Sequence, residues 1–103
     1  MRNASLWKSN LSEAMLNKAD FNSADIREAN LENSNFSEAN LTNSDLSNSN
    51  LLGANFDGAI LEGADMRKVS GLTIEQLLKA ASFNNIKLGP ALKDQLKNAK
   101  LKP

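Results

Sequence analysis

Carboxylates are the side chains that could carry acid-base or metal chemistry in this sequence. The 103 residues include no His, Cys or Tyr, which excludes a Ser-His-Asp triad, a reactive thiolate, a disulfide and a zinc site with Cys or His ligands. Catalysis by paired carboxylates and a Mg²⁺ or Ca²⁺ site remain open. The most regular set is Asp25, Asp45 and Asp65, which recur every twenty residues. They meet only in a fold that brings residues twenty apart together.

Aromatic and basic residues offer a second kind of chemistry, which is contact with another macromolecule. Trp7 is the single tryptophan, and an exposed indole is a common anchor of protein interfaces. Trp7 could instead fold over the N-terminal end of the protein as a cap. Near the other end, Lys93, Lys97 and Lys100, followed by Lys102, could capture an acidic partner or simply keep this segment soluble.

The overall charge says little because two opposite regions cancel. Twelve basic and twelve acidic residues give a net charge of zero, with −4 on residues 1–68 and +4 on residues 69–103. The total gives no reason to expect direct binding of nucleic acid or membranes. No apolar run approaches the ~20 residues of a membrane span, and the sequence starts without a signal-peptide stretch. We therefore expect a cytoplasmic protein, with a cleaved upstream presequence left open.

The element that must position these residues is a five-residue repeat. Large apolar residues occur at thirteen positions, spaced five apart without a failure. Two residues before each one stands Ala or Ser, and the residue between is Asn or Asp in ten of the thirteen repeats. The large residues are Leu6, Leu11, Leu16, Phe21, Ile26, Leu31, Phe36, Leu41, Leu46, Leu51, Phe56, Leu61 and Met66.

A period of five fits neither a helix nor a flat strand. On an α-helix each step of five turns the side chain by ~140°, so the apolar residues would face every direction. On a strand an odd step changes face each time. Within one repeat, however, the small and large residues lie on the same side of a short extended segment, and the two residues that follow suit a turn. The chain is therefore expected to coil around a core of its own large side chains.

The sequence resembles the pentapeptide-repeat family, whose repeat reads A(D/N)LXX. The clearest copies are residues 19–23, 29–33, 39–43 and 64–68, and the match runs from residue 4 to residue 68. The resemblance implies an all-β solenoid, a right-handed four-sided β-helix of about three coils with four repeats in each. We expect this repeat domain over residues 1–70, and a helical C-terminal cap with a basic tail over residues 71–103.

Four repeats per coil would place residues twenty apart in one column, ~4.8 Å from each other. Inside, Phe36 would stack on Phe56. Outside, Asn10, Asn30 and Asn50 would form an amide ladder. The three Asp residues would form a carboxylate ladder, in which like charges repel unless a cation or a partner meets them. Two interpretations are open: a ladder that binds a cation or imitates the DNA backbone, or simply the usual outward residue of the repeat.

After residue 68 the repeat stops and helical signals begin. Thr73 and Gln76 have the spacing of a capping box, which predicts a helix over residues 73–81. Its apolar face would consist of Ile74, Leu77, Leu78 and Ala81. Residues 82–88 predict an extended piece, whose Phe83, Ile86 and Leu88 would fill the space beneath the cap. Pro90 would open a second short helix, with Leu92 and Leu96 on one face.

These helices are expected to cover the last coil, as they often do in the family, and to hide a strand edge that would otherwise be exposed. The N-terminal end carries no comparable signal. End-to-end self-association through the first coil is therefore open.

The pattern as a whole favours a non-catalytic module that binds another protein or serves as a scaffold. A straight coil offers no cleft for paired carboxylates, and we expect neither a cofactor nor a metal. The alternative is a DNA mimic that binds DNA gyrase or topoisomerase, as quinolone-resistance members of the family do. The residues expected to contact a partner are Trp7, Asp25, Asp45, Asp65, Lys93, Lys97 and Lys100.

Overall fold

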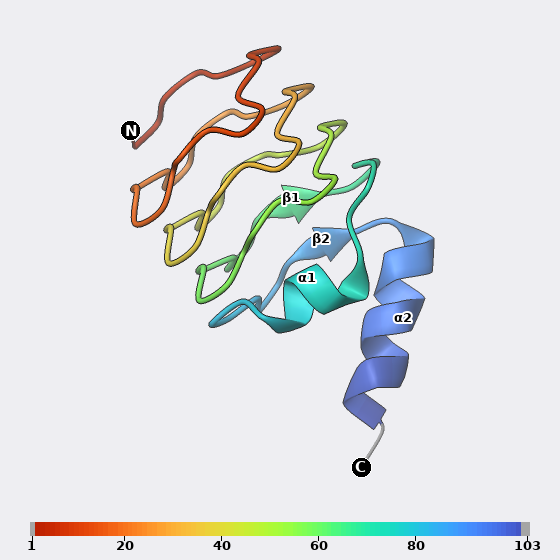
Figure 1. The fold of residues 1–103 in the computed structure, drawn as a ribbon. Helices are drawn as coiled ribbons and strands as arrows, with labels where there is room; N and C mark the ends of the chain where they lie inside the picture. The colour runs from red at the N-terminus through yellow and green to blue at the C-terminus, as the bar shows by residue number, and fades with distance from the viewer. Residues whose placement is uncertain (1, 102–103) are drawn as a thin grey trace.

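The computed structural model describes residues 2–101, and the side chains of residues 2–99. The chain winds into a stack of coils that is covered at one end by a short helical segment (Figure 1). The regular elements are β1 (Asp65–Met66), α1 (Ile74–Leu78), β2 (Lys87–Leu88) and α2 (Pro90–Leu101). The predicted fold, a right-handed four-sided β-helix with a C-terminal helical cap, is confirmed.

Residues twenty apart stack, as four repeats per coil require. Ten isolated parallel bridges join such pairs, from Ser5 with Asp25 to Asn50 with Ser70. The Asp25 N–H donates to the carbonyl of Ala4 at 2.9 Å, and the Asp25 carbonyl accepts from the N–H of Leu6 at 2.7 Å. The middle residue of each side thus turns both its backbone groups toward the preceding coil. This ladder satisfies the backbone of segments too short to form ordinary strands.

Each corner of the coil is a tight turn, which explains the two residues that end the repeat. At the first complete corner the Ser9 N–H donates to the carbonyl of Leu6 at 3.0 Å. Between them Lys8 has a φ of 61°, the value of the third residue in a type II turn, where Gly is usual. Later corners do use Gly, as at Gly58 with φ 69°. A non-Gly residue in this conformation costs roughly 1 kcal/mol.

The Asn or Asp of the repeat closes the turn that follows it. Its side-chain oxygen accepts from the backbone N–H two residues later, at 2.9–3.2 Å, in all ten repeats that carry Asn or Asp. Asn10, Asn30 and Asn50 stack in one column as predicted. Their oxygens, however, bond within their own turns rather than along the rod. The expected amide ladder is therefore wrong in its hydrogen bonding, because the local turn takes the acceptor first.

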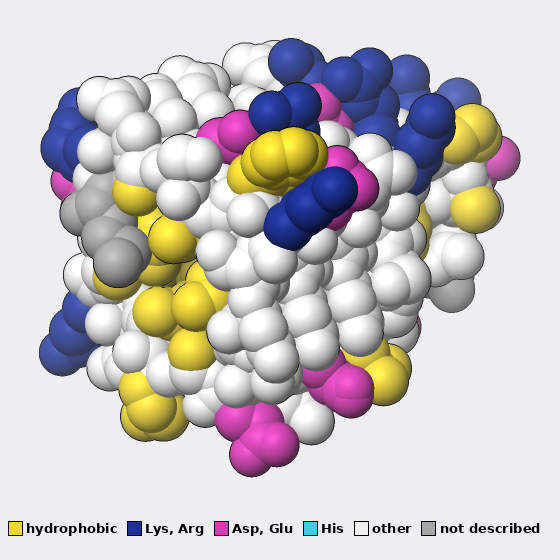
Figure 2. Space-filling model, turned by 90° about the horizontal axis from the view of Figure 1, so that it is seen from above, with side chains coloured by type: hydrophobic (Ala, Val, Ile, Leu, Met, Phe, Trp, Pro, Cys, Tyr) yellow, Lys and Arg dark blue, Asp and Glu magenta, His cyan; other side chains and the backbone are white. Residues whose placement is uncertain are grey.

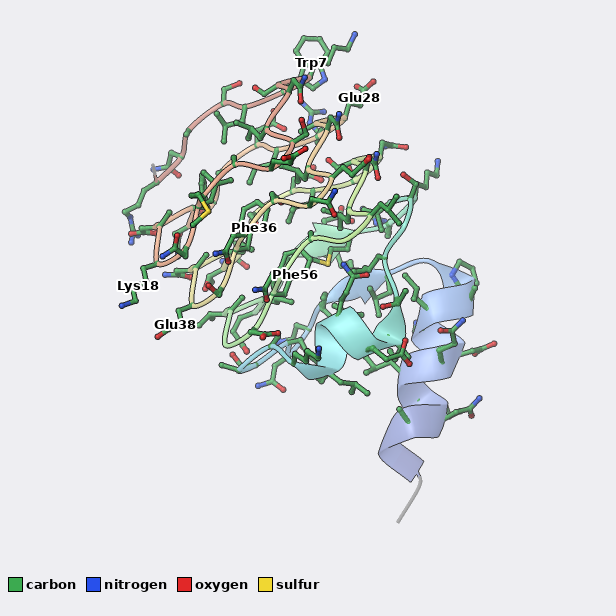
Figure 3. The ribbon with its side chains drawn as sticks, viewed as in Figure 1. Trp7, Lys18, Glu28, Phe36, Glu38 and Phe56 are labelled. Atoms are coloured by element: carbon green, nitrogen blue, oxygen red, sulfur yellow. The ribbon has the colours of Figure 1, made fainter. Side chains whose placement is uncertain are left out.

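Large side chains fill the inside of the coil. The rings of Phe36 and Phe56 are stacked, with centroids 5.5 Å apart and planes 10° apart, as predicted (Figure 3). Phe21 meets Phe36 edge-on at 5.8 Å. From the second coil onward the large residues are completely or almost completely buried. Ser fits the small inner position because its hydroxyl bonds a backbone carbonyl, as Ser34 does with Leu31 at 2.7 Å.

The first part of the cap follows the sequence prediction. Thr73 and Gln76 form the capping box, and Leu77 is fully buried. The Gln76 side chain also donates to the carbonyls of Leu51 and Ala54, at 3.1 and 2.8 Å, which fastens α1 to the third coil.

The predicted helix over residues 73–81 is too long, because α1 ends at Leu78. Beyond it the Ala81 N–H donates to the carbonyl of Ala59 at 2.8 Å, so the chain has returned to the coil ladder. Stacked residues are now 22 apart in the sequence instead of 20, as in the bridge between Ile60 and Ser82. The reason is that the segment with α1 is longer than the two repeats whose place it takes. Phe83, Ile86 and Leu88 pack against the core as predicted.

The second helix has a different place from the one expected. It begins at Pro90 as predicted, but α2 runs for twelve residues and contacts α1, while its free end projects from the coil (Figure 1). Leu92 and Leu96 are half-buried. The last coil is covered by α1 and residues 80–88, whose backbone continues the ladder, and α2 adds little to this cover.

The two ends of the coil differ in how well the core is closed. Leu6, Leu11 and Leu16 are only partly buried, whereas the residues stacked beneath them are buried. Figure 2 shows apolar side chains in a hollow at this end. None of the described residues covers it. Within residues 2–101, no helix is long and apolar enough to cross a membrane.

Candidate functional site

Trp7 lies at a corner on the outside of the coil and is 51% exposed. Its indole N–H donates to a carboxylate oxygen of Glu28 at 2.9 Å, and the Lys8 ammonium lies 4.7 Å from the ring centroid (Figure 3). Glu28 belongs to the next coil, because the Lys8 N–H bonds the carbonyl of Arg27 at 3.0 Å. The interpretation of Trp7 as a cap over the first coil is therefore wrong, since the hydrogen bond holds it against the side of the rod.

The three Asp residues stack in one column, as the spacing of twenty predicted. The column is not exposed along its length, because β2 pairs with β1 and sets Lys87 against Asp65, which is only 9% exposed. Two of the three carboxylates also have a guanidinium partner. Arg27 bonds Asp25 with both contacts at 2.8 Å, and Arg67 bonds Asp65 at 3.0 and 2.7 Å. Asp45, between them, accepts from the Ser47 hydroxyl at 2.7 Å.

The column thus carries its own cations, which corrects the expectation of an uncompensated acidic ladder. Hydrogen bonding from Arg27 lowers the pKa of the Asp25 carboxyl, and Arg67 does the same for Asp65, with a smaller attraction from Lys87. In return the two carboxylates raise the pKa of both guanidinium groups. The two Asp–Arg pairs therefore stay charged at neutral pH. Two of the three carboxylates of the column are thus held in ion pairs.

The lysines expected to capture a partner lie on α2. Lys93 and Lys97 are four residues apart, so they share one exposed face of the helix. The side chain of Lys100 and all of Lys102 lie outside the described residues. α2 starts directly after β2, whose residues stack on the Asp column. The lysine face and the Asp column therefore belong to neighbouring parts of the chain, but no ion pair joins them among the described side chains.

Hollows occur where the helices meet the last coil, a feature that the repeat pattern did not predict. One of them has a volume of about 520 Å³ and lies between Met66, α1 and the first turn of α2. Its charged groups are Lys68 and Glu75, and its other lining includes Leu72 and Leu92. No paired carboxylates line it. Within the described residues, no three acidic side chains converge on a point that could hold a metal ion.

The structure adds residues that the sequence reasoning missed. Arg27, Glu28, Arg67 and Lys87 all touch or face a predicted contact residue. A signal for two of them was present, because Asp-x-Arg occurs at two positions forty residues apart, at 25–27 and 65–67. The turn geometry folds the Arg back on the Asp two residues earlier. We call Trp7, Lys8, Arg27, Glu28 and Arg67 the Trp7 strip, because their corners stack on one another.

Comparison with known proteins agrees with this architecture. A family profile described as pentapeptide repeats matches residues 1–33 and 34–70, in eight copies. No curated protein sequence matches this chain.

Several solved structures have a similar fold. A pentapeptide repeat protein, Rfr23, from the cyanobacterium Cyanothece 51142 is 34% identical, with a TM-score of 0.65 over 84% of this chain and 54% of that one. Full-length QnrB1, a plasmid-mediated fluoroquinolone resistance protein, is 18% identical, with a TM-score of 0.73 over 93% of this chain and 44% of that one. A pentapeptide repeat protein from the Arabidopsis thaliana thylakoid lumen is 20% identical, with a TM-score of 0.57 over 82% of this chain. The chain thus spans 44–61% of the length of these structures.

Proposed function

Because the chain belongs to the pentapeptide-repeat family, we propose that it is a non-catalytic module that binds another protein through the Trp7 strip. The proposal rests on the exposure and the fixed orientation of the Trp7 side chain. Its ring is half exposed, yet a hydrogen bond to Glu28 and the Lys8 ammonium over its face hold it in one orientation. An indole that is already ordered loses little entropy on binding, which suits an interface anchor.

The surroundings of Trp7 define the chemistry of the partner. Arg27 and Arg67 lie on the same side of the rod as Trp7, each paired with an Asp, and Glu28 lies at the same corner as Arg27 and bonds the indole. Charges of both signs therefore lie close to the indole. A partner that fits would offer an apolar pocket for the indole and a rim of mixed charge, rather than a surface of a single sign.

The test is capture of partners from the source lysate with matched variants. Trp7→Ala removes the anchor, and Leu52→Ala removes an apolar side chain of similar exposure, 54%, from a different corner. A protein that binds the wild type and Leu52→Ala but not Trp7→Ala supports the proposal. Equal capture by Trp7→Ala would refute the role of this strip.

Two other predicted contacts are tested in the same experiment. The Asp25/Asp45/Asp65→Asn variant removes the charges of the column but keeps the oxygens that close the turns. A Lys93/Lys97/Lys100→Gln variant removes the positive face of α2. Loss of the same protein with either variant would extend the contact beyond the Trp7 strip. A scaffold or spacer role without a specific partner predicts that no protein distinguishes these variants from wild type.

The gyrase-binding alternative has less support in the geometry. Similarity to QnrB1 at 18% identity concerns the fold alone. A DNA mimic needs an uninterrupted acidic surface, whereas Asp25 and Asp65 are paired with arginines and α2 is basic. A DNA gyrase supercoiling assay tests this alternative, and inhibition by the wild type that is lost in the triple Asn variant would favour it. The cytoplasmic location and the boundary at residue 70 remain predictions.

A further inference from the structure

The third coil leaves a hollow in the corner that carries Trp7. The corner residues of the four coils stack along one edge of the rod, and they are 7–8, 27–28, 47–48 and 67–68 (Figure 1). In the third coil these residues are Ser47 and Asn48, which are short and uncharged. Between them and the next corner lies a hollow of about 250 Å³, which we call the corner hollow. It is lined by Ser47, Asn48, Arg67 and Lys68.

The corner hollow contains hydrogen-bond donors that none of the described residues uses. Asp65 accepts from the Nε and Nη2 groups of Arg67 at 3.0 and 2.7 Å, which fixes the guanidinium and leaves Nη1 without a described acceptor. Lys68 forms no ion pair with any described side chain. The Asn48 side chain also has no hydrogen-bond partner in the part of the chain that the structure describes. The hollow thus brings together a fixed guanidinium, an unpaired ammonium and an available amide.

We propose that the corner hollow binds a phosphomonoester group, carried by a small molecule or by a phosphorylated residue of a protein segment. This inference goes beyond the proposed function and does not depend on it. A phosphomonoester has a charge between about −1.5 and −2 at pH 7 and three acceptor oxygens. These match the guanidinium of Arg67, the ammonium of Lys68 and the amide of Asn48. The volume of about 250 Å³ is several times the ~30 Å³ of one water molecule, so a tetrahedral anion fits with part of its hydration.

The charges around the corner hollow favour a single anionic group over a nucleic acid strand. A strand needs a cation near each successive phosphate. One coil before the hollow, however, Arg27 is already paired with Asp25, and the carboxylate of Glu28 stands at the same corner (Figure 3). A strand that followed the corner would therefore meet a negative charge next to the site.

Asp45 limits the affinity of the corner hollow. Its carboxylate lies on the neighbouring side of the coil and accepts from the Ser47 hydroxyl at 2.7 Å, so Ser47 contributes its small size rather than a donor. Because this carboxylate has no cationic partner among the described side chains, it repels an incoming anion. We expect a dissociation constant of about 1 mM for inorganic phosphate, which an NMR titration measures.

Titration with three probes at constant ionic strength tests the site and identifies the carrier of the phosphate. The probes are inorganic phosphate, a short peptide with one phosphoserine, and the same peptide without the phosphate. We expect the ¹H–¹⁵N signals of the Asn48 side-chain amide and the Arg67 Nε–H group to shift and saturate with the first two probes only. Tighter binding of the phosphopeptide than of inorganic phosphate indicates a protein segment as the carrier, and equal binding indicates a small molecule.

Three results of the titration would contradict the proposal. The first is the absence of saturation at about twenty times the expected dissociation constant. The second is an equal shift with the unphosphorylated peptide. The third is tighter binding of a single-stranded oligonucleotide at the same signals, which would assign the hollow to nucleic acid.

Matched charge variants separate the corner hollow from the overall charge of the chain. Asn48→Asp places a carboxylate in the hollow, whereas Asn43→Asp makes the same change at the preceding corner, where φ is 57° instead of 63°. Asn48→Asp should weaken phosphate binding at least about tenfold, and Asn43→Asp less than about twofold. In a second pair, Lys68→Gln should weaken binding about three- to tenfold and Lys18→Gln should leave it unchanged. Equal effects within either pair of folded variants, checked by thermal melting, would overturn the proposal, since the anion would then respond to net charge alone.

Discussion

Replacing Asp65 by Asn tests whether the acidic column is held together by its own arginines. The exchange is nearly isosteric, and Asn closes the same turn in other repeats, so the bond to the backbone N–H of Arg67 at 3.1 Å is kept. The exchange removes the negative charge of the carboxylate, to which Arg67 donates two hydrogen bonds at 3.0 and 2.7 Å. The Asp65 side chain is 12% exposed and that of Arg67 59%, so solvent screens the pair in part.

The expected loss follows from this geometry. A two-contact pair that is half open to water contributes about 1 kcal/mol at neutral pH. The folded protein lowers the pKa of Asp65 below its ordinary value of 3.8. A carboxyl whose pKa is lowered on folding stabilises the protein above the unfolded value, and this contribution disappears as pH falls through the folded value. The difference between wild type and Asp65→Asn should therefore be largest at pH 7 and shrink below about pH 4.

Urea denaturation followed by circular dichroism, at pH 7 and pH 3, measures both effects. Asp45→Asn is the matched control, because Asp45 lies in the same column but bonds Ser47 instead of a guanidinium. Its free energy of unfolding should change by less than about 0.5 kcal/mol. The reasoning is refuted if Asp65→Asn loses as much stability at pH 3 as at pH 7, or if Asp45→Asn behaves like it.

Three further predictions concern the fold. Ala39→Leu should lower the melting temperature more than Glu38→Leu, because Ala39 is fully buried and overpacking costs about 1–3 kcal/mol; equal melting temperatures would contradict the inward position. Lys18→Gly should stabilise the chain by up to about 1 kcal/mol in urea denaturation, since Lys18 has a φ of 63°, and Gly58→Ala should destabilise it by a similar amount. Gln76→Ala should cost about 2 kcal/mol in the same assay and raise hydrogen exchange in α1, because its side chain bonds two carbonyls of the coil; unchanged exchange would show that α1 is held by other contacts.

The repeat predicted the architecture because each of its five positions carries one kind of residue and has one place in the coil. Every fifth large residue fills the core, and the spacing of twenty correctly aligned Phe36 with Phe56 and the Asp column. The capping box at Thr73 was equally visible, since it depends on two residues at a fixed spacing. These features are local or strictly periodic, so a single sequence reveals them.

The remaining features depend on how separate segments meet. The end of α1 at Leu78 was missed because the backbone N–H of Ala81 bonds a carbonyl of the coil instead of continuing the helix. Helix propensity depends on local sequence alone and does not include such a bond to a distant segment. The pairing of Arg67 with Asp65 could be predicted only with the geometry of the turn that joins them. The position of the Trp7 side chain depends on its hydrogen bond to Glu28, which lies one coil further along the chain. Lys87 stacks on the Asp column 22 residues after Asp65, whereas the regular repeat predicts stacking only at intervals of twenty.

The central claim is that the side of the coil at Trp7 binds a partner protein. Because the chain has a single tryptophan, labelling with 5-fluorotryptophan gives one ¹⁹F resonance that reports on this strip alone. The most direct measurement adds the captured partner to the labelled chain while size-exclusion chromatography confirms the complex. A shift of this resonance that saturates with the complex is the predicted result. A complex that forms while the resonance keeps its position and width would contradict the claim.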